Sequence, residues 1–66
     1  MKITVTGMTC QHCEMAVRKA LTSVKGVSNV VSVDRLNAEA IVEGNPDVAD
    51  LIKAVESAGY HARAAN

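Results

Sequence analysis

The chain has 66 residues, which suffices for one domain with a thin hydrophobic core and excludes a second domain. Hydrophobic residues make up 48% of the sequence, but Tyr60 is the only aromatic residue, so the predicted core consists of small aliphatic side chains. Seven basic and seven acidic residues balance, and this neutrality, with the lack of aromatic side chains for base stacking, argues against nucleic-acid binding.

The first elements follow from hydrophobic periodicity. Residues 2–6 alternate polar and apolar, which predicts a half-buried strand. From Cys13 onward apolar residues recur at helical spacing, and Gly26 is predicted to stop this helix in a left-handed conformation. Glu14 and Arg18 are four residues apart, which predicts a weak ion pair on the solvent face. The apolar stripe consists of Ala16, Val17, Ala20, Leu21 and Val24.

A strand is predicted over residues 28–34, with Val31 and Val33 facing inward. Val30 breaks this alternation, so either the strand begins in the other register or a β-bulge lies there, and the sequence leaves both open. Residues 34–37 are mostly polar and are interpreted as the turn of a hairpin.

The return strand is predicted over residues 38–43, with Ala40 and Val42 facing inward. Asn45 is the predicted cap of a second helix, with Pro46 in its first position and Asp47 in its first turn. The stripe of this helix consists of Val48, Leu51, Ile52, Val55 and Ala58.

Gly59 is predicted to end the second helix, and residues 60–64 alternate as a short last strand. In that strand Tyr60 and Ala62 lie opposite His61 and Arg63. The order strand, helix, strand, strand, helix, strand predicts an α+β, ferredoxin-like βαββαβ sandwich. We expect residues 1–66 to form a single domain in which two helices cover one face of a four-stranded antiparallel sheet.

The stretch MTCQHC, residues 8–13, contains both cysteines of the chain. A Cys10–Cys13 disulfide would close only a very small loop and would stabilise the fold little. No segment is long and apolar enough for a membrane span, and no signal-peptide pattern follows Lys2. The expectation is therefore a cytoplasmic protein without membrane insertion, in which the thiols stay reduced.

Cys10 and Cys13 lie where a loop enters a helix, so both sulfurs can point at one position. The positive helix N-terminus favours their thiolate forms. Zinc requires four ligands, whereas a soft, low-coordinate ion such as Cu(I) is satisfied by two thiolates. His12 is predicted to point about 100° away from the cysteines, and His61 is predicted to face outward.

A Cys-x-x-Cys sequence at a helix start is also the thioredoxin signature, which leaves a small dithiol oxidoreductase as an alternative. The aromatic residue that usually precedes that motif, and the proline usually found within it, are absent here. Metal carriage is therefore favoured over enzymatic redox chemistry, and the protein is not expected to be an enzyme.

The GMTCxxC motif after the first strand, the Gly26-Val27 pair and the Gly59-Tyr60 pair resemble the heavy-metal-associated (HMA) domain, and most closely the free-standing bacterial copper chaperones of the CopZ kind. This resemblance implies Cu(I) held by Cys10 and Cys13 and passed by thiolate exchange to a similar domain of a copper-transporting P-type ATPase. One ion per monomer, or copper bridging a homodimer, is expected. Ag(I) or Hg(II) could replace copper, because mercury-binding relatives share the motif.

Four residues near the cysteines are secondary candidates. His12 is predicted to be a tuner of the thiolates or a surface residue in preference to a third ligand. His61 is predicted to be a surface residue, with a metal ligand shared with a second molecule as the alternative. Met8 is interpreted as an apolar plug beneath the loop. Tyr60 is interpreted as a core aromatic, a lid over the thiolates, or both.

Two further expectations concern partners. Met15, with Arg18 and Lys19, is predicted to belong to a small docking surface beside the cysteines. A start at Met1 and an end at Asn66 favour a free chaperone, but the N-terminal metal-binding domain of a copper-transporting ATPase stays open as an alternative.

Overall fold

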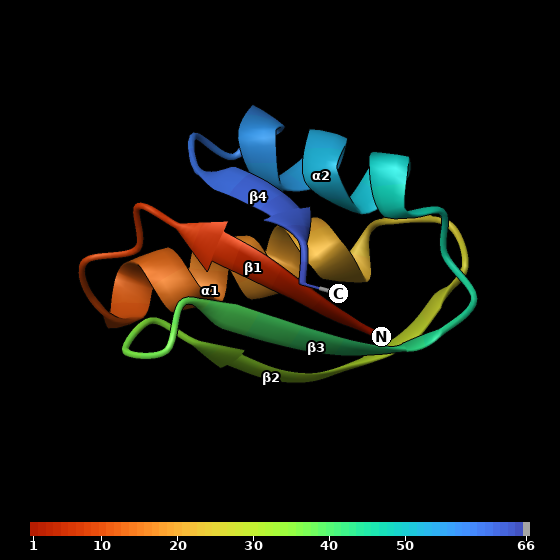
Figure 1. The fold of residues 1–66 in the computed structure, drawn as a ribbon, viewed down its shortest axis with the longest axis horizontal. Helices are drawn as coiled ribbons and strands as arrows, with labels where there is room; N and C mark the ends of the chain where they lie inside the picture. The colour runs from red at the N-terminus through yellow and green to blue at the C-terminus, as the bar shows by residue number, and fades with distance from the viewer. Residues whose placement is uncertain (66) are drawn as a thin grey trace.

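The computed structural model describes residues 1–65, which contain four strands and two helices in the predicted order. The strands form one antiparallel sheet with the order β2-β3-β1-β4, and both helices pack on the same face of it (Figure 1). The predicted ferredoxin-like sandwich is thereby confirmed. No helix within these 65 residues is both long and apolar enough to cross a bilayer. The elements are β1 (Lys2–Thr6), α1 (Gln11–Thr22), β2 (Val27–Asp34), β3 (Glu39–Gly44), α2 (Val48–Ser57) and β4 (His61–Ala64).

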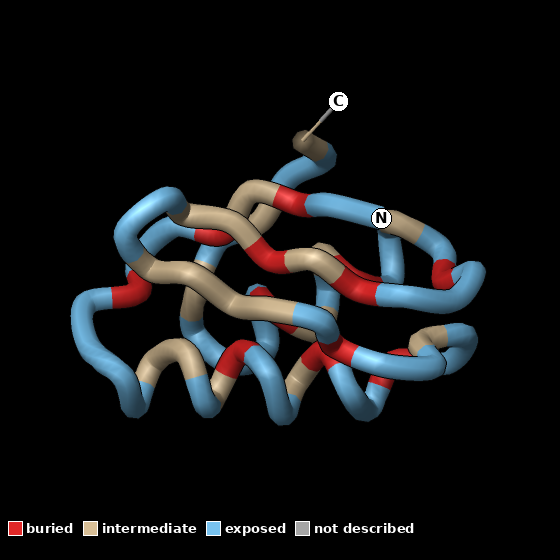
Figure 2. The backbone as a smooth tube through the Cα atoms, turned by 90° about the horizontal axis from the view of Figure 1, so that it is seen from below, coloured by how far each residue is buried: buried red, intermediate tan, exposed pale blue. Residues whose placement is uncertain are grey.

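The core lies between the sheet and the helices, where the buried segments recur at intervals along both layers (Figure 2). Strand periodicity correctly predicted Ala40 and Val42 as inward residues, and both are almost completely buried. Helical periodicity likewise identified the buried residues of both helices, Val17 and Leu21 in α1 and Leu51 and Val55 in α2. The prediction of Ala58 as a member of the second stripe is wrong, because it is the exposed C-cap that follows the helix end at Ser57. The largest fully buried side chains are Ile3, Leu21, Leu51, Val5, Val17, Val42 and Val55.

Strand β2 settles the ambiguity at Val30 in favour of an irregular strand. The pairing of β2 with β3 shifts register between Val27 and Asn29 and again between Val30 and Ser32. Val30 is only 5% exposed, whereas Val31 is 48% exposed, so the prediction that Val31 faces inward is wrong. A bulge turns the strand locally, so that the inward series is carried by Val30 instead.

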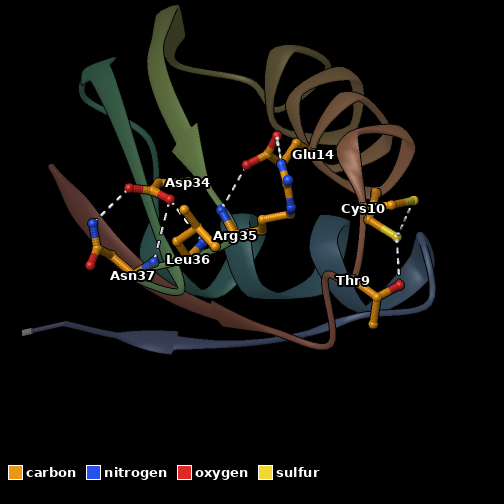
Figure 3. A network of polar contacts seen from close by, with 8 residues as sticks. Thr9, Cys10, Glu14, Asp34, Arg35, Leu36 and Asn37 are labelled. Atoms are coloured by element: carbon orange, nitrogen blue, oxygen red, sulfur yellow. Dashed lines mark hydrogen bonds and ion pairs between the residues drawn. The ribbon is translucent and has the colours of Figure 1, made fainter.

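The β2–β3 turn is organised by the carboxylate of Asp34. It accepts hydrogen bonds from the Leu36 backbone N–H at 2.8 Å, the Asn37 backbone N–H at 3.3 Å and the Asn37 side-chain amide at 2.7 Å (Figure 3). These donors, the Leu36 N–H first, lower the pKa of Asp34 below its ordinary value. Ala38 has a left-handed φ of 54°, so β3 begins at Glu39, one residue later than predicted.

Two helix boundaries differ from the prediction. Helix α1 begins at Gln11, ahead of Cys13, and ends at Thr22 with Ser23 as a right-handed C-cap. Gly26, with a φ of 97°, therefore lies in the connection beyond the helix and does not itself stop it. A Cβ atom there would come within 2.9 Å of the Pro46 Cα, so Gly26 also permits a close crossing of two chain segments.

The cap of α2 is Asp47 and not Asn45. The Asp47 side chain accepts a hydrogen bond from the Ala49 N–H at 3.1 Å, and the helix begins at Val48. The Asn45 N–H instead donates to the Gly26 carbonyl at 2.9 Å. That contact holds Asn45 and Pro46 in the connection and moves the first helical position two residues along the chain.

Candidate metal centre

The loop between β1 and α1 presents both cysteines at one end of the molecule. Gly7 leaves β1 with a left-handed φ of 95°, and Met8 turns inward, where it is 9% exposed and belongs to the core. The prediction of Met8 as an apolar plug agrees with this placement. Cys10 is the N-cap of α1 and is exposed, and Cys13 lies half-buried in the first turn.

The two sulfurs converge. The Cys10 Sγ and Cys13 Sγ atoms are 3.8 Å apart, and both thiols are free (Figure 3). This separation exceeds the roughly 2.05 Å of a disulfide bond and leaves both sulfurs available as donors. The Thr9 Oγ1 atom lies 3.7 Å from the Cys13 Sγ. An ion that approaches from solvent meets two soft donors and a neighbouring hydroxyl.

The surroundings of Cys13 stabilise its thiolate. The pKa of Cys13 is lowered from 9.0 to about 6, first by hydrogen bonding from the Tyr60 side chain and then by the backbone and hydroxyl of Thr9 and the backbone of Cys10. The same contact raises the pKa of Tyr60, with burial and the charges of Cys13 and Cys10 as further causes. At neutral pH the site therefore offers Cys13 largely as the anion that binds soft metals.

Tyr60 is placed by the end of α2. The Gly59 N–H donates to the Glu56 carbonyl at 3.0 Å, and the Tyr60 N–H donates to the Val55 carbonyl at 3.2 Å, which together form a Schellman motif around the left-handed Gly59. Gly59 therefore closes the helix as predicted. Tyr60 packs partly buried against the core, as predicted, and its side chain is the largest cause of the lowered Cys13 pKa. Its role as a lid over the thiolates stays a prediction.

The two histidines lie on the surface. His12 is exposed on α1, and His61 is exposed on β4, where it pairs with Thr6. Within residues 1–65, no three side chains of the types His, Cys, Asp and Glu are grouped closely enough to hold a metal ion. Cys10 and Cys13 are thus brought together, and neither His12 nor His61 joins them in a three-donor group.

Tertiary contacts around α1 were not visible in the sequence. The predicted Glu14–Arg18 pair is wrong, because each side chain finds a partner in the sheet layer. Glu14 binds Arg35 of the β2–β3 turn, and Arg18 donates to the Val30 carbonyl at 2.9 Å. Only the position of Thr9 one helical turn before Cys13 offered a local signal; the other partners are distant in sequence.

Met15 is 65% exposed and borders a shallow depression between α1 and β2. Its lining includes Gln11, Glu14 and Val33. Met15 is therefore an exposed apolar side chain two residues after Cys13 on α1, and the docking surface proposed around it stays a prediction.

Comparison with known proteins places the chain in a family. The profile of the heavy-metal-associated domain matches residues 2–61. The probable copper-exporting P-type ATPase of Archaeoglobus fulgidus is 48% identical over 60 residues, which cover 89% of this chain and 7% of the ATPase. The mercuric transport protein periplasmic component of Serratia marcescens is 43% identical over 61 residues, which cover 88% of this chain and 66% of that protein.

Structural similarity agrees with the sequence matches. A solved CopZ metallochaperone superposes with a TM-score of 0.86 at 30% identity, covering 96% of this chain and 97% of that one. The chain spans less than two thirds of the curated relatives above, and only 11% and 8% of a mercuric reductase and a copper-transporting ATPase that it also matches. With its profile match over residues 2–61 and its βαββαβ fold, the chain belongs to the heavy-metal-associated domain family.

Proposed function

We propose that this domain carries Cu(I) on the thiolates of Cys10 and Cys13 and delivers it to the metal-binding domain of a copper-transporting P-type ATPase. The observation that carries the proposal is the pair of free sulfurs 3.8 Å apart at an exposed end of the molecule. The family assignment supports a heavy-metal ligand in general. The choice of copper rests on the donor set.

Two sulfur donors suit Cu(I) better than Zn(II). With the zinc–thiolate bond of about 2.3 Å as a guide, two bonds in line with the metal would separate the sulfurs by about 4.6 Å. Small rotations of the two side chains would widen the observed separation of 3.8 Å to this distance. No three-residue donor group occurs in the described part of the chain, so a closed four-ligand zinc site lacks its remaining protein ligands.

Exposure of Cys10 supports transfer by ligand exchange. An incoming thiolate of the partner can add to the copper as a third ligand before Cys10 or Cys13 leaves, so the ion is never free in solution. The same geometry would allow copper to bridge two copies of this chain through both cysteine pairs. Either arrangement requires that the sulfurs lie at the surface and not in the core.

The relatives support a copper ATPase as the partner or as the parent protein. One relative is named a probable copper-exporting P-type ATPase, and the structural neighbour named CopZ is called a metallochaperone. A free cytoplasmic chaperone and an N-terminal domain of the ATPase would use the same two thiolates. Of the two, we propose the free carrier as the principal function.

A mercury carrier is the second candidate. It is favoured by the 43% identity to a protein named as the periplasmic component of mercuric transport. Hg(II) is a soft ion that two thiolates also satisfy, as is Ag(I). Two thiolate donors therefore discriminate between soft and hard metal ions more strongly than between Cu(I) and Hg(II).

An anaerobic competition titration with Cu(I), Hg(II) and Zn(II) tests this function, with the number of sulfur ligands measured by X-ray absorption. We expect one Cu(I) per monomer, or per bridged pair of sites, with sulfur ligands only, and Zn(II) bound far more weakly. Cys10→Ser and Cys13→Ser should each abolish tight binding, because one thiolate remains. Ser23→Ala, a small change at the far end of α1, is the matched control.

Transfer is tested by mixing the copper-loaded protein with the metal-free N-terminal domain of a copper ATPase and following the copper after separation. Stoichiometric movement of the ion supports the carrier function. Preference for Hg(II) with no copper transfer would favour the mercury alternative, and turnover of a disulfide substrate that metal inhibits would establish the dithiol oxidoreductase instead.

A further inference from the structure

We propose that Glu14 is a positioning residue for the two metal-binding thiols, because it fastens the first turn of α1 to the β2–β3 turn through Arg35. This inference rests on the proposed function of Cys10 and Cys13 as ligands. Glu14 does not contact either sulfur; it acts on the backbone that carries them.

The contact is a two-point bridge from one carboxylate. The Glu14 Oε2 atom accepts the Arg35 backbone N–H at 2.8 Å, and the Glu14 Oε1 atom accepts the Arg35 Nη1 at 3.1 Å (Figure 3). The Glu14 side chain is 22% exposed and the Arg35 side chain 34% exposed. Because one of the two donors is a backbone group, the bridge fixes the position of Glu14 as well as pairing its charge.

The first turn of α1 is weakly secured at its N-terminal end. Its N-cap, Cys10, makes no side-chain capping hydrogen bond. The Cys10 carbonyl accepts the N–H groups of Cys13 at 3.0 Å and Glu14 at 3.3 Å, and Cys13 packs partly against the core. Uncapped first turns open readily, since their N–H groups lack partners. Holding Glu14 against the sheet layer therefore also holds the residues whose N–H groups bind Cys10.

The turn that carries Arg35 is held by its own hydrogen bonds. Arg35 directly follows Asp34, whose carboxylate accepts three hydrogen bonds within the turn. In Figure 1 this turn and the cysteine loop lie at the same end of the molecule. Before the cysteines along the chain, the buried side chain of Met8 holds the loop against the core. Cys10 and Cys13 therefore lie in a segment that is held at both ends, by Met8 in the core and by Glu14 bound to Arg35.

The consequence is preorganisation of the dithiol. Released from Arg35, the first turn would sample conformations in which the Sγ atoms lie farther apart than 3.8 Å. Ordering them would then oppose metal binding, because a preformed site binds more tightly than one that must be assembled.

The chain contains a matched control. Arg18 also joins α1 to β2, through one charge-assisted hydrogen bond of 2.9 Å to the Val30 carbonyl, but it lies one turn farther from the cysteines. Arg18→Met should lower stability as removal of a helix–sheet contact does, without changing the relation between the two sulfurs. Glu14→Ala should change both.

The test measures the dithiol without metal. Apo-protein is equilibrated with reduced and oxidised glutathione; one oxidised glutathione takes two electrons and two protons from Cys10 and Cys13, which leaves an intramolecular disulfide and two reduced glutathione molecules. The equilibrium constant reports how readily the sulfurs meet. We expect Glu14→Ala to lower it about tenfold, the smaller loss typical of groups that orient metal ligands, and Arg18→Met to leave it unchanged.

Glu14→Gln keeps an oxygen that accepts the Arg35 N–H and should give an intermediate value. An unchanged constant in Glu14→Ala, an equal loss in Arg18→Met, or a loss in Glu14→Gln as large as that in Glu14→Ala would each overturn the inference. Cu(I) affinity measured in parallel should fall by a similar factor in Glu14→Ala. If the parent protein bound no Cu(I), the proposed function would fail, while the glutathione result would still decide the role of Glu14.

Discussion

Cys13 gains its reactivity from residues that lie on separate elements. Thr9 belongs to the loop before α1, and Tyr60 follows α2 at the other end of the chain. Their convergence lowers the pKa of Cys13 to about 6, which favours the thiolate form at neutral pH. A residue-scale account of the site therefore includes Tyr60 beside the two cysteines.

Replacing Tyr60 with Phe should raise the pKa of Cys13 from about 6 toward its ordinary 9.0, because the largest contribution is the Tyr60 hydrogen bond. The shift should be incomplete, since Thr9 and Cys10 still contribute. The measurement is the pH dependence of alkylation by iodoacetamide, with Cys10→Ser as the common background so that one thiol reacts.

Tyr60→Phe should also change how the free energy of unfolding depends on pH. A thiol with a lowered pKa in the folded state stabilises the protein fully above pH 9, and this contribution is lost as pH falls through about 6. Apo-protein should therefore become more resistant to urea between pH 6 and pH 9, and Tyr60→Phe should reduce the gain. Identical alkylation profiles in the two proteins would show that Tyr60 does not act on Cys13.

At the scale of elements, helix ends and strand irregularities place the functional residues. The Schellman motif at the end of α2 directs the chain at Tyr60 back toward the cysteine loop. The bulge in β2 turns Val30 inward, while its carbonyl accepts the hydrogen bond from Arg18. The first feature places Tyr60 near the cysteine loop, and the second ties α1 to β2 through Arg18.

Gly59→Ala should lower the free energy of unfolding by about 1–2 kcal/mol, because an alanine at a φ of 98° pays the left-handed backbone penalty. Steric crowding adds nothing, since no atom lies within 4 Å of the position of a Cβ there. Urea denaturation at pH 7 gives the value. Gly59→Asn, which tolerates the left-handed conformation better, is the control; an equal loss in both variants would contradict the conformational explanation.

At the scale of the whole molecule, stability depends on a small aliphatic core. Among residues 1–65 the buried set contains no aromatic residue, and only Ile3, Leu21 and Leu51 exceed valine in size among its fully buried members. A domain of this length has a free energy of unfolding of only about 3–10 kcal/mol, at roughly 0.05–0.15 kcal/mol per residue. A single core substitution should therefore remove a large part of the free energy of unfolding.

Leu51→Ala should cost about 2–5 kcal/mol, since the side chain is completely buried and its removal leaves a cavity. We expect a large part of that population to be unfolded at 37 °C, as measured by circular dichroism. Leu51→Met, which conserves volume, should cost less than about 1.5 kcal/mol. Equal thermal midpoints for the Ala variant and the parent protein would contradict this description of the core.

Periodicity and spacing in the sequence predicted the order of the elements, the inward residues of β3 and the most deeply buried residues of both helices, whereas Ala58, placed in the second stripe, is exposed. Periodicity and spacing are local properties of the sequence. The buried face of a strand or helix, and the nearness of two cysteines in a Cys-x-x-Cys motif, can therefore be predicted without knowledge of the rest of the chain. The closure of α2 at Gly59 was likewise predictable, because left-handed helix ends favour glycine.

The residues around Cys10 and Cys13 are set by contacts between elements that lie far apart in the sequence. Asn45 carries the sequence signal of a helix cap, but its N–H binds the Gly26 carbonyl and Asp47 becomes the cap. Glu14 and Arg18 have helical spacing for an ion pair, yet each binds a partner distant in sequence. Such contacts leave no periodic trace, because they depend on how the folded layers meet and not on neighbours along the chain. The pair of sulfur donors is therefore a property of the sequence, while their separation, their ionisation and their anchoring arise from the packing of the helices on the sheet.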